Sequence, residues 1–161
     1  MTRTKITNHW LAIFTECAKK ARQPKPEIVA ELILKKCSTM MGNLRQRSKD
    51  AGATFAISLE AIREAVALAY GDPCPYCEDT LKVTKSRGLS ADHINPLTRG
   101  GMTTPENIEI ICQRCNRRKD VIGKENFLWL MRGVNQWPED ERSSVLTRLS
   151  TGGNHYGRGK R

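Results

Sequence analysis

At 161 residues the chain is long enough for one modest domain with appendages and too short for two large independent domains. Hydrophobic residues make up 39% and aromatic residues 6%, so the apolar core should be thin and a cross-link is expected to stabilise it. Lys and Arg outnumber Asp and Glu by 27 to 17, which gives a formal charge of +10 and favours a polyanionic partner over a basic surface without a ligand.

No segment approaches the roughly 18 apolar residues that a membrane span needs, and residues 1–30 carry basic side chains around an interrupted apolar face. We therefore expect no membrane association, no secretion signal and a cytoplasmic location, in the host cytoplasm if a phage encodes the chain. The 6 cysteines should then be reduced thiols, so paired cysteines indicate metal binding rather than disulfides.

Two amphipathic helices are expected at the start of the chain. Over residues 6–21 apolar side chains recur at three- and four-residue steps, and the proline-rich run that follows ends this pattern. A second helix should begin near Pro26 and end near Gly42. We take residues 1–42 as an N-terminal helical region. The basic stretch 43–50 could form a helical turn or a solvated loop.

A short strand and a third helix are expected next. Residues 55–57 are typical of a strand, and Ser58 is a suitable cap for a helix over residues 59–69. Gly71 is placed to end that helix, because glycine readily adopts the left-handed conformation found after helix C-termini.

The last part of the chain should be helical and then disordered. The pattern predicts helices over residues 125–131 and 138–149, so that residues 124–149 would pack on the core. Residues 150–161 are rich in Gly, Arg and Lys and cannot form a core, so we expect a disordered basic tail.

Two C-x-x-C pairs indicate a metal site. Each pair can present two thiolates from one tight turn, and four thiolates complete the closed tetrahedral site that zinc prefers. A redox dithiol and four buried apolar thiols are the alternatives, and both fit this spacing less well. Cys17 and Cys37 lie on the predicted apolar helix faces and should be core residues. The predicted ligands of a structural zinc ion are Cys74, Cys77, Cys112 and Cys115.

An Asp-His pair lies between the cysteine pairs, where a short strand would end. Asp92 offers a hard oxygen suited to Mg²⁺, and His93 offers a base that titrates near neutrality. Adjacent strand residues point to opposite faces, so a turn or bulge must re-aim one of them if both serve one phosphate. The other two histidines are distant in sequence, which disfavours a multi-histidine zinc centre and favours magnesium or manganese. Alone, such a pair is more often a simple surface turn.

From about residue 43 to 119 the sequence resembles the HNH, or ββα-metal, endonuclease family. The matching features are Asp-His-Ile, a Pro two residues on, a Gly-Gly, a Glu-Asn-Ile, and C-x-x-C-Asn followed by basic residues. Members of the family cradle one divalent cation between two short strands and a helix. The resemblance implies an α+β fold, with a small ββα-metal core and four-cysteine zinc site over residues 43–123, flanked by α-helices at both ends.

By this resemblance His93 would be the general base, and Asn107 would brace the loop and orient the histidine. Asp92 and Asn116 would be the ligands of a catalytic Mg²⁺ or Mn²⁺. Asn116 stands where many members have His, which resembles the HNH domain of the CRISPR-associated nuclease. Taken alone, Asn107 could be a turn cap, and the basic run at residues 117–119 could be a solvated helix face. The residues expected beside DNA phosphates are Arg99, Arg117, Arg118 and Lys119.

The activity implied is that of a metal-dependent DNA endonuclease, a phosphodiesterase that leaves 5′-phosphate and 3′-hydroxyl ends. Two alternatives remain: a noncatalytic zinc-stabilised module that binds nucleic acid, and a nuclease of the same fold that cuts RNA. Few aromatic residues are available to stack on unpaired bases, which favours double-stranded DNA. One active site cuts one strand per engagement, so a monomer should nick and a homodimer could cut both strands.

Overall fold

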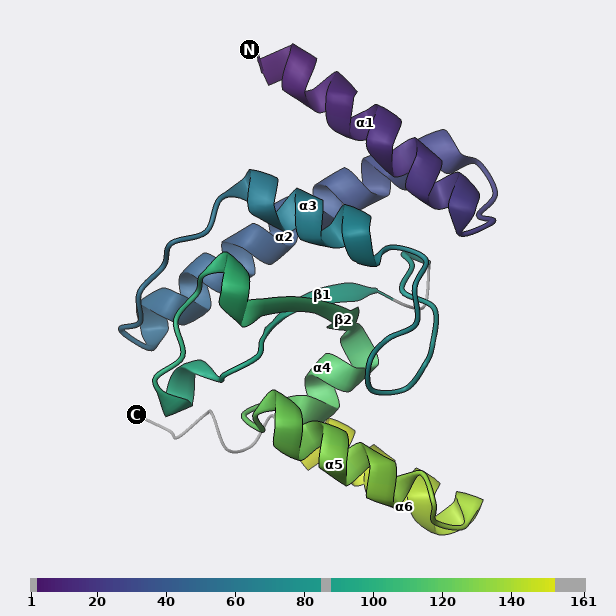
Figure 1. The fold of residues 1–161 in the computed structure, drawn as a ribbon, viewed down its shortest axis with the longest axis vertical. Coiled ribbons are helices and arrows are strands. Elements are labelled where there is room, and N and C mark those ends of the chain that lie inside the picture. Colours follow the sequence, from purple (N-terminus) through teal and green to yellow (C-terminus); the bar gives the residue numbers. More distant parts are fainter. Residues whose placement is uncertain (1–2, 85–87, 153–161) are drawn as a thin grey trace.

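The computed structural model describes residues 3–84 and 88–152 (Figure 1). Its helices and strands are, in chain order, α1 (Arg3–Lys20), α2 (Pro26–Asp50), α3 (Leu59–Ala69), β1 (Leu89–His93), β2 (Ile108–Cys112), α4 (Gln113–Lys119), α5 (Lys124–Val134) and α6 (Glu139–Gly152). Two short 3-10 turns, Leu97–Arg99 and Pro105–Asn107, lie in the loop between the strands. This is the α+β fold that the sequence predicts. None of the helices within the described residues is long and apolar enough to cross a bilayer.

Helices α1 and α2 form a hairpin, and α2 continues behind α3 on the same side of the sheet (Figure 1). The buried side chains of Phe14 and Cys37 lie in their shared core. The predicted end of α2 near Gly42 is wrong, because the helix runs on to Asp50 and residues 43–50 are helical. Leu44 and Ser48 are buried one and two turns beyond Met40, so the inward-facing stripe of the helix continues through this basic stretch.

The chain between α2 and α3 is an extended linker rather than a strand. The predicted strand over residues 55–57 is wrong, since only a single parallel bridge joins Phe55 to Thr103. The backbone of Thr103 is nevertheless held on both sides: its N–H donates to the Thr54 carbonyl (2.9 Å) and its carbonyl accepts from the Ala56 N–H (2.8 Å). The predicted cap of α3 is confirmed, because the Ser58 side chain accepts a hydrogen bond from a backbone N–H of the first turn.

Strands β1 and β2 pair antiparallel without a bulge, from Leu89 opposite Cys112 to His93 opposite Ile108. Helix α4 follows β2 directly and packs on both strands. The ββα arrangement predicted for this segment is therefore confirmed. In Figure 1, α2 and α3 lie on one side of the two-stranded sheet, and α4, α5 and α6 lie on the other.

The C-terminal helices α5 and α6 lie beside α4. Phe127, Met131 and Val134 are the buried residues of α5. Helix α6 extends to Gly152, so residues 150–152 are helical where a tail was expected, and the Ser150 hydroxyl donates to the Leu146 carbonyl within this helix. The rest of the predicted tail, 153–161, lies outside the described residues.

Candidate active site and metal site

The two C-x-x-C pairs meet although 34 residues separate Cys77 from Cys112. The turn after α3 supplies the first pair, and the start of α4 supplies the second. All four sulfur atoms lie within 4.8 Å of one another, and the Sγ atoms of Cys77 and Cys112 are 3.7 Å apart. A tetrahedral zinc ion bound at about 2.3 Å requires sulfur atoms about 3.8 Å apart, so this cluster could hold a structural metal such as zinc.

The charge state of the cluster also suits a cation. Hydrogen bonds from the neighbouring thiols lower the pKa of Cys112 to about 7 and that of Cys77 far below its usual range. Arg114 places its guanidinium 4.0 Å from the Cys77 sulfur and pairs with Asp79, so a positive charge lies beside the thiolates. The same contacts among the thiols raise the pKa values of Cys74 and Cys115, so the four thiols share their protons, and loss of a proton gives the thiolate form in which cysteine binds metal.

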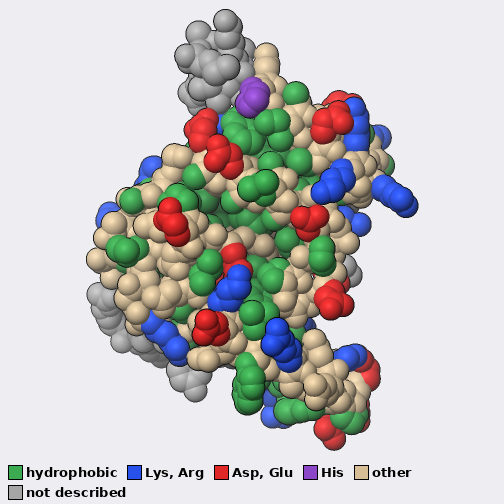
Figure 2. Space-filling view, viewed as in Figure 1, with side chains coloured by type: hydrophobic (Ala, Val, Ile, Leu, Met, Phe, Trp, Pro, Cys, Tyr) green, Lys and Arg blue, Asp and Glu red, His purple; other side chains and the backbone are tan. Residues whose placement is uncertain are grey.

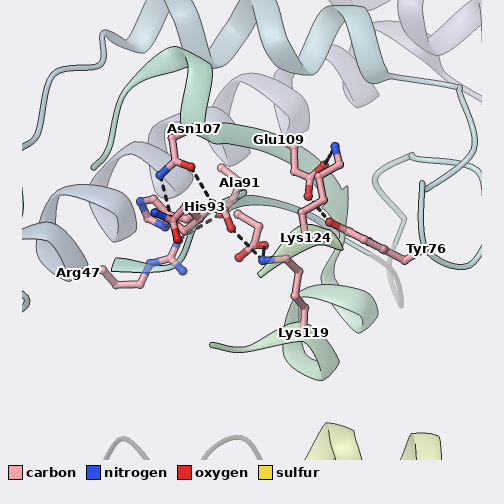
Figure 3. A network of polar contacts seen from close by, with 10 residues as sticks. Arg47, Tyr76, Ala91, His93, Asn107, Glu109, Lys119 and Lys124 are labelled. Atoms are coloured by element: carbon pink, nitrogen blue, oxygen red, sulfur yellow. Dashed lines mark hydrogen bonds and ion pairs between the residues drawn. The ribbon is translucent and has the colours of Figure 1, made fainter. Parts of the chain in front are cut away.

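A buried tyrosine ties the first cysteine pair to the sheet (Figure 3). The Tyr76 hydroxyl donates to one carboxylate oxygen of Glu109 on β2, and Lys124 of α5 contacts the other at 2.7 Å. Burial, reinforced by the bond to Glu109, raises the pKa of Tyr76, so the hydroxyl keeps its proton. The Tyr76 ring also packs edge-on against Phe127, with centroids 4.8 Å apart. Sequence reasoning missed this network because no motif links its members.

Asp92 and Lys119 form a buried ion pair at the end of β1. The Lys119 ammonium lies 2.7 Å from Asp92 Oδ2 and donates to the His93 carbonyl at 2.8 Å, as Figure 3 shows. Lys119 has no exposed surface, and the Asp92 side chain is 5% exposed. The prediction that Lys119 contacts DNA is therefore wrong: its place on the inner face of α4 points the ammonium at the sheet.

The Oδ2 atom of Asp92 has the Lys119 ammonium as its close partner. This atom is buried and, within the described residues, makes no hydrogen bond of ordinary geometry despite the nearby ammonium. Burial raises the pKa of Asp92, while Lys119 and Arg47 oppose that rise. A carboxylate offers the hard oxygen atoms that Mg²⁺ binds.

His93 is buried beside this pair, with 4% of its surface exposed. Its Nε2 lies 2.7 Å from the Thr103 hydroxyl. Burial, and then the charges of Arg47 and Lys119, lower the pKa of His93 to about 4. The imidazole is therefore neutral at pH 7. Asp92 and His93 both line one hollow at the point where β1 ends, and β1 pairs with β2 without a bulge there.

Arg47 of α2 borders this hollow, and sequence reasoning gave it no role. Its guanidinium donates to the Ala91 carbonyl at 3.1 Å, directly before the Asp-His pair (Figure 3). Burial lowers the pKa of Arg47, and the charge of Asp92 opposes that decrease. Lys49 lies on the same basic turn, so charge alone could not have singled out Arg47.

Asn107 makes three side-chain hydrogen bonds across the loop after His93. Its side-chain oxygen accepts from the Asn95 N–H at 2.8 Å, and its amide donates to the carbonyls of Asn95 (3.0 Å) and Met102 (2.6 Å). The loop is also too tight for a side chain at Gly101, where a Cβ atom would lie 2.1 Å from the Asn95 carbonyl oxygen. The role predicted for Asn107 in orienting His93 stays a prediction.

Asn116 lies in the adjoining hollow rather than with Asp92. That hollow is lined by residues of α2, β1 and α4, among them Lys36, Asn43, Arg47, Asn116 and Arg117. The hollow that holds His93 is lined by Arg47, Asp50, Asp92, Pro96, Leu97 and Asp120, among others. Arg47 borders both, so one arginine connects the two halves of the predicted metal site.

The other predicted DNA contacts differ in exposure. Arg99 and Arg117 are exposed, while Arg118 is partly buried and donates to the Ser150 hydroxyl of α6 at 3.1 Å. Figure 2 shows one face of the molecule, on which Lys and Arg side chains are interspersed with acidic and apolar ones. Basic side chains do not gather into a patch on that face.

Comparison with known proteins agrees with this geometry. Residues 74–121 match the family model described as HNH endonuclease. No curated protein and no solved structure matches the chain. The chain therefore contains an HNH endonuclease domain, in which four cysteines are clustered. Helix α2, which supplies Arg47, lies outside the matched segment.

Proposed function

We propose that this protein is a DNA endonuclease that hydrolyses phosphodiester bonds with His93 as the general base. The observation that carries the proposal is a buried, neutral imidazole beside a buried carboxylate, at the end of β1 and within the HNH segment. A module that only binds nucleic acid needs phosphate contacts on its surface and gains nothing from burying Asp92 and His93 next to each other.

His93 acts by taking a proton from water as the water attacks phosphorus. Because its pKa is about 4, the imidazole is unprotonated throughout the neutral range, which is the form that can accept a proton. General base catalysis of this kind contributes about 10² to 10⁴ in rate. The Lys119 ammonium holds the backbone carbonyl of His93 and keeps the strand end in place.

Asp92 would hold a catalytic Mg²⁺ or Mn²⁺ through a hard carboxylate oxygen, while its Oδ2 atom is paired with Lys119. Asn116, in the adjoining hollow, is the second ligand we propose. A cation bound there would neutralise the phosphate and the departing 3′ oxygen. Magnesium needs only one or two protein ligands beside substrate phosphate and water, which suits a site with a single buried carboxylate.

The substrate's phosphate backbone is proposed to follow the two adjoining hollows that Arg47 borders. Arg117 and Lys36 line one of them together with Arg47, which also borders the His93 hollow, where Asp50, Asp92 and Asp120 are the other charged residues. Arg99 is exposed on the loop that follows the His93 hollow and could contact the same strand. With aromatic residues at 6% of the chain, duplex DNA is favoured over unpaired RNA.

We assign a structural zinc ion to the four-cysteine cluster, separate from the catalytic cation. Four sulfur ligands leave no open position, so zinc there would join the turn after α3 to the start of α4 without taking part in hydrolysis. Helix α4 carries Asn116 and Lys119, so this join would also fix the helix that supports the active site.

The test is cleavage of supercoiled plasmid by the zinc-loaded protein with Mg²⁺. We expect nicked or linear products from the wild type and from His9→Ala, a matched control because His9 is exposed on α1. His93→Ala should lose at least about 10²-fold in rate while binding DNA normally. Intact plasmid in every lane would refute the enzyme assignment, and cleavage confined to a parallel RNA substrate would change the substrate to RNA.

A further inference from the structure

The His93 ring is supported by a chain of hydrogen bonds that begins on α2, outside the HNH segment. At the end of this chain farthest from His93, the Ser48 hydroxyl donates to the Leu44 carbonyl at 2.9 Å. The Ser48 and Thr103 hydroxyl oxygens are 2.5 Å apart, and the Thr103 hydroxyl lies 2.7 Å from His93 Nε2. Ser48, Thr103 and His93 are all buried, at 1%, 0% and 4% exposure, so water does not supply alternative partners along the chain.

The direction of each bond follows from counting protons. A hydroxyl has one hydrogen, and a carbonyl can only accept. Since Ser48 gives its hydrogen to Leu44, the Thr103 hydroxyl must donate to Ser48. The Thr103 oxygen can then only accept from His93, which requires a hydrogen on Nε2.

The charges around the ring favour the same arrangement. With Nε2 turned to Thr103, Nδ1 is the ring nitrogen left for the hollow that Arg47 also lines. A lone pair facing a guanidinium is more stable than an N–H facing it. Within the described residues, no hydrogen bond joins Nδ1 to the protein.

We propose that Ser48 and Thr103 are positioning residues that hold His93 in the tautomer protonated on Nε2, leaving Nδ1 as the basic nitrogen. The tautomer follows from the hydrogen-bond chain alone, whereas its importance for cleavage rests on the proposed function. Thr103 is well suited to this role because the linker before α3 clamps its backbone through Thr54 and Ala56.

The test reads the tautomer directly by ¹⁵N NMR of the full-length, zinc-loaded protein at pH 7 without magnesium. The chain has 3 histidines, and a His93→Gln sample identifies the His93 ring signals. We expect the wild type to show a proton on Nε2 and a bare Nδ1. In Ser48→Ala the Thr103 hydrogen becomes free to point at Nε2, so the population should shift toward the tautomer protonated on Nδ1.

Two further variants keep the test decisive if Ser48→Ala fails to fold. Thr103→Ser retains the hydroxyl and should keep the wild-type tautomer, whereas Thr103→Val removes it and should give a mixture. Ser38→Ala is the matched control, since its hydroxyl also donates to the carbonyl four residues earlier but is exposed on α2. The proposal is overturned if the wild type carries its proton on Nδ1, or if Thr103→Val and Thr103→Ser show the same tautomer.

Cleavage kinetics then show whether the tautomer matters for catalysis. Because only the correctly protonated fraction can act, Ser48→Ala should lower kcat about tenfold and leave KM unchanged. Wild-type protein with the predicted tautomer but no nuclease activity would refute the proposed function and leave the hydrogen-bond chain intact. An active enzyme with the opposite tautomer would refute only the role of Ser48 and Thr103 and would leave the proposed function intact.

Discussion

Lys119→Met should strongly destabilise the protein, because it removes the buried ammonium that compensates Asp92. The side chain has no exposed surface and makes two close contacts, with Asp92 Oδ2 at 2.7 Å and the His93 carbonyl at 2.8 Å. Removing one partner of a buried ion pair costs about 3 to 5 kcal/mol. Arg47 remains beside Asp92 and the carboxyl can take up a proton, so we expect a loss near the lower end, about 3 kcal/mol.

The assay is urea unfolding of zinc-loaded protein, followed by far-UV circular dichroism at pH 7. Lys124→Met is the matched control. It also removes an ammonium 2.7 Å from a carboxylate, that of Glu109, but the Lys124 side chain is 35% exposed. Such a pair contributes about 1 kcal/mol or less. Equal losses of stability in Lys119→Met and Lys124→Met would refute the reasoning that burial makes the Asp92 pair the costly one to break.

The pH dependence gives a second check on the same variant. Burial already raises the pKa of Asp92, and loss of Lys119 raises it further. An acid whose pKa is higher in the folded state than in the unfolded state costs stability above that pKa, and protonation relieves the cost. The loss of stability of Lys119→Met relative to the wild type should therefore become smaller as pH falls from 7 to 5. Replacing Asp92 by Asn in the same protein should recover part of the loss at pH 7.

Three further predictions follow from the same geometry. Cys115→Ser should lose bound zinc and cooperative unfolding, measured by elemental analysis and circular dichroism, whereas Cys37→Ala, at an equally buried thiol outside the cluster, should keep its zinc. Because the His93 pKa falls from 6.5 unfolded to about 4 folded, the wild type should lose about 1.3 kcal/mol more stability than His93→Gln between pH 7.5 and 5.5; parallel pH profiles would contradict this. Asn107→Ala removes three side-chain hydrogen bonds and should cost about 2 kcal/mol, with a larger loss of cleavage than of DNA binding, and unchanged melting would argue against its bracing role.

The sequence was most informative where local spacing dictates geometry. Two C-x-x-C turns can present four thiolates in only a few ways, so Cys74 and Cys112 could be assigned to one cluster from their motifs. The length of α2 could not be read from Gly42, because one glycine costs a helix only about 1 kcal/mol. Burial of Leu44 and Ser48 outweighs that cost, and this burial depends on the fold of the whole chain.

Roles that depend on packing between distant segments were not predictable. Lys119 follows Arg117 and Arg118 in an unbroken basic run, and only the packing of α4 on β1 distinguishes the buried residue from its neighbours. Arg47 and Ser48 precede the HNH segment by more than twenty residues and belong to no motif. Their link to the active site arises because α2 lies along β1, a contact that hydrophobic periodicity alone does not specify.

The unit that can perform the proposed chemistry is accordingly larger than the matched segment. Residues 74–121 contain a two-stranded sheet and one short helix, which cannot by themselves bury His93. The burial that keeps the imidazole neutral depends on α2, and the Thr103 clamp depends on the linker before α3. A boundary at residues 42–43 would cut through the continuous helix that carries Arg47 and Ser48. Helix α2 therefore belongs to the structure around the proposed active site, and the smallest functional fragment should begin no later than the start of α2.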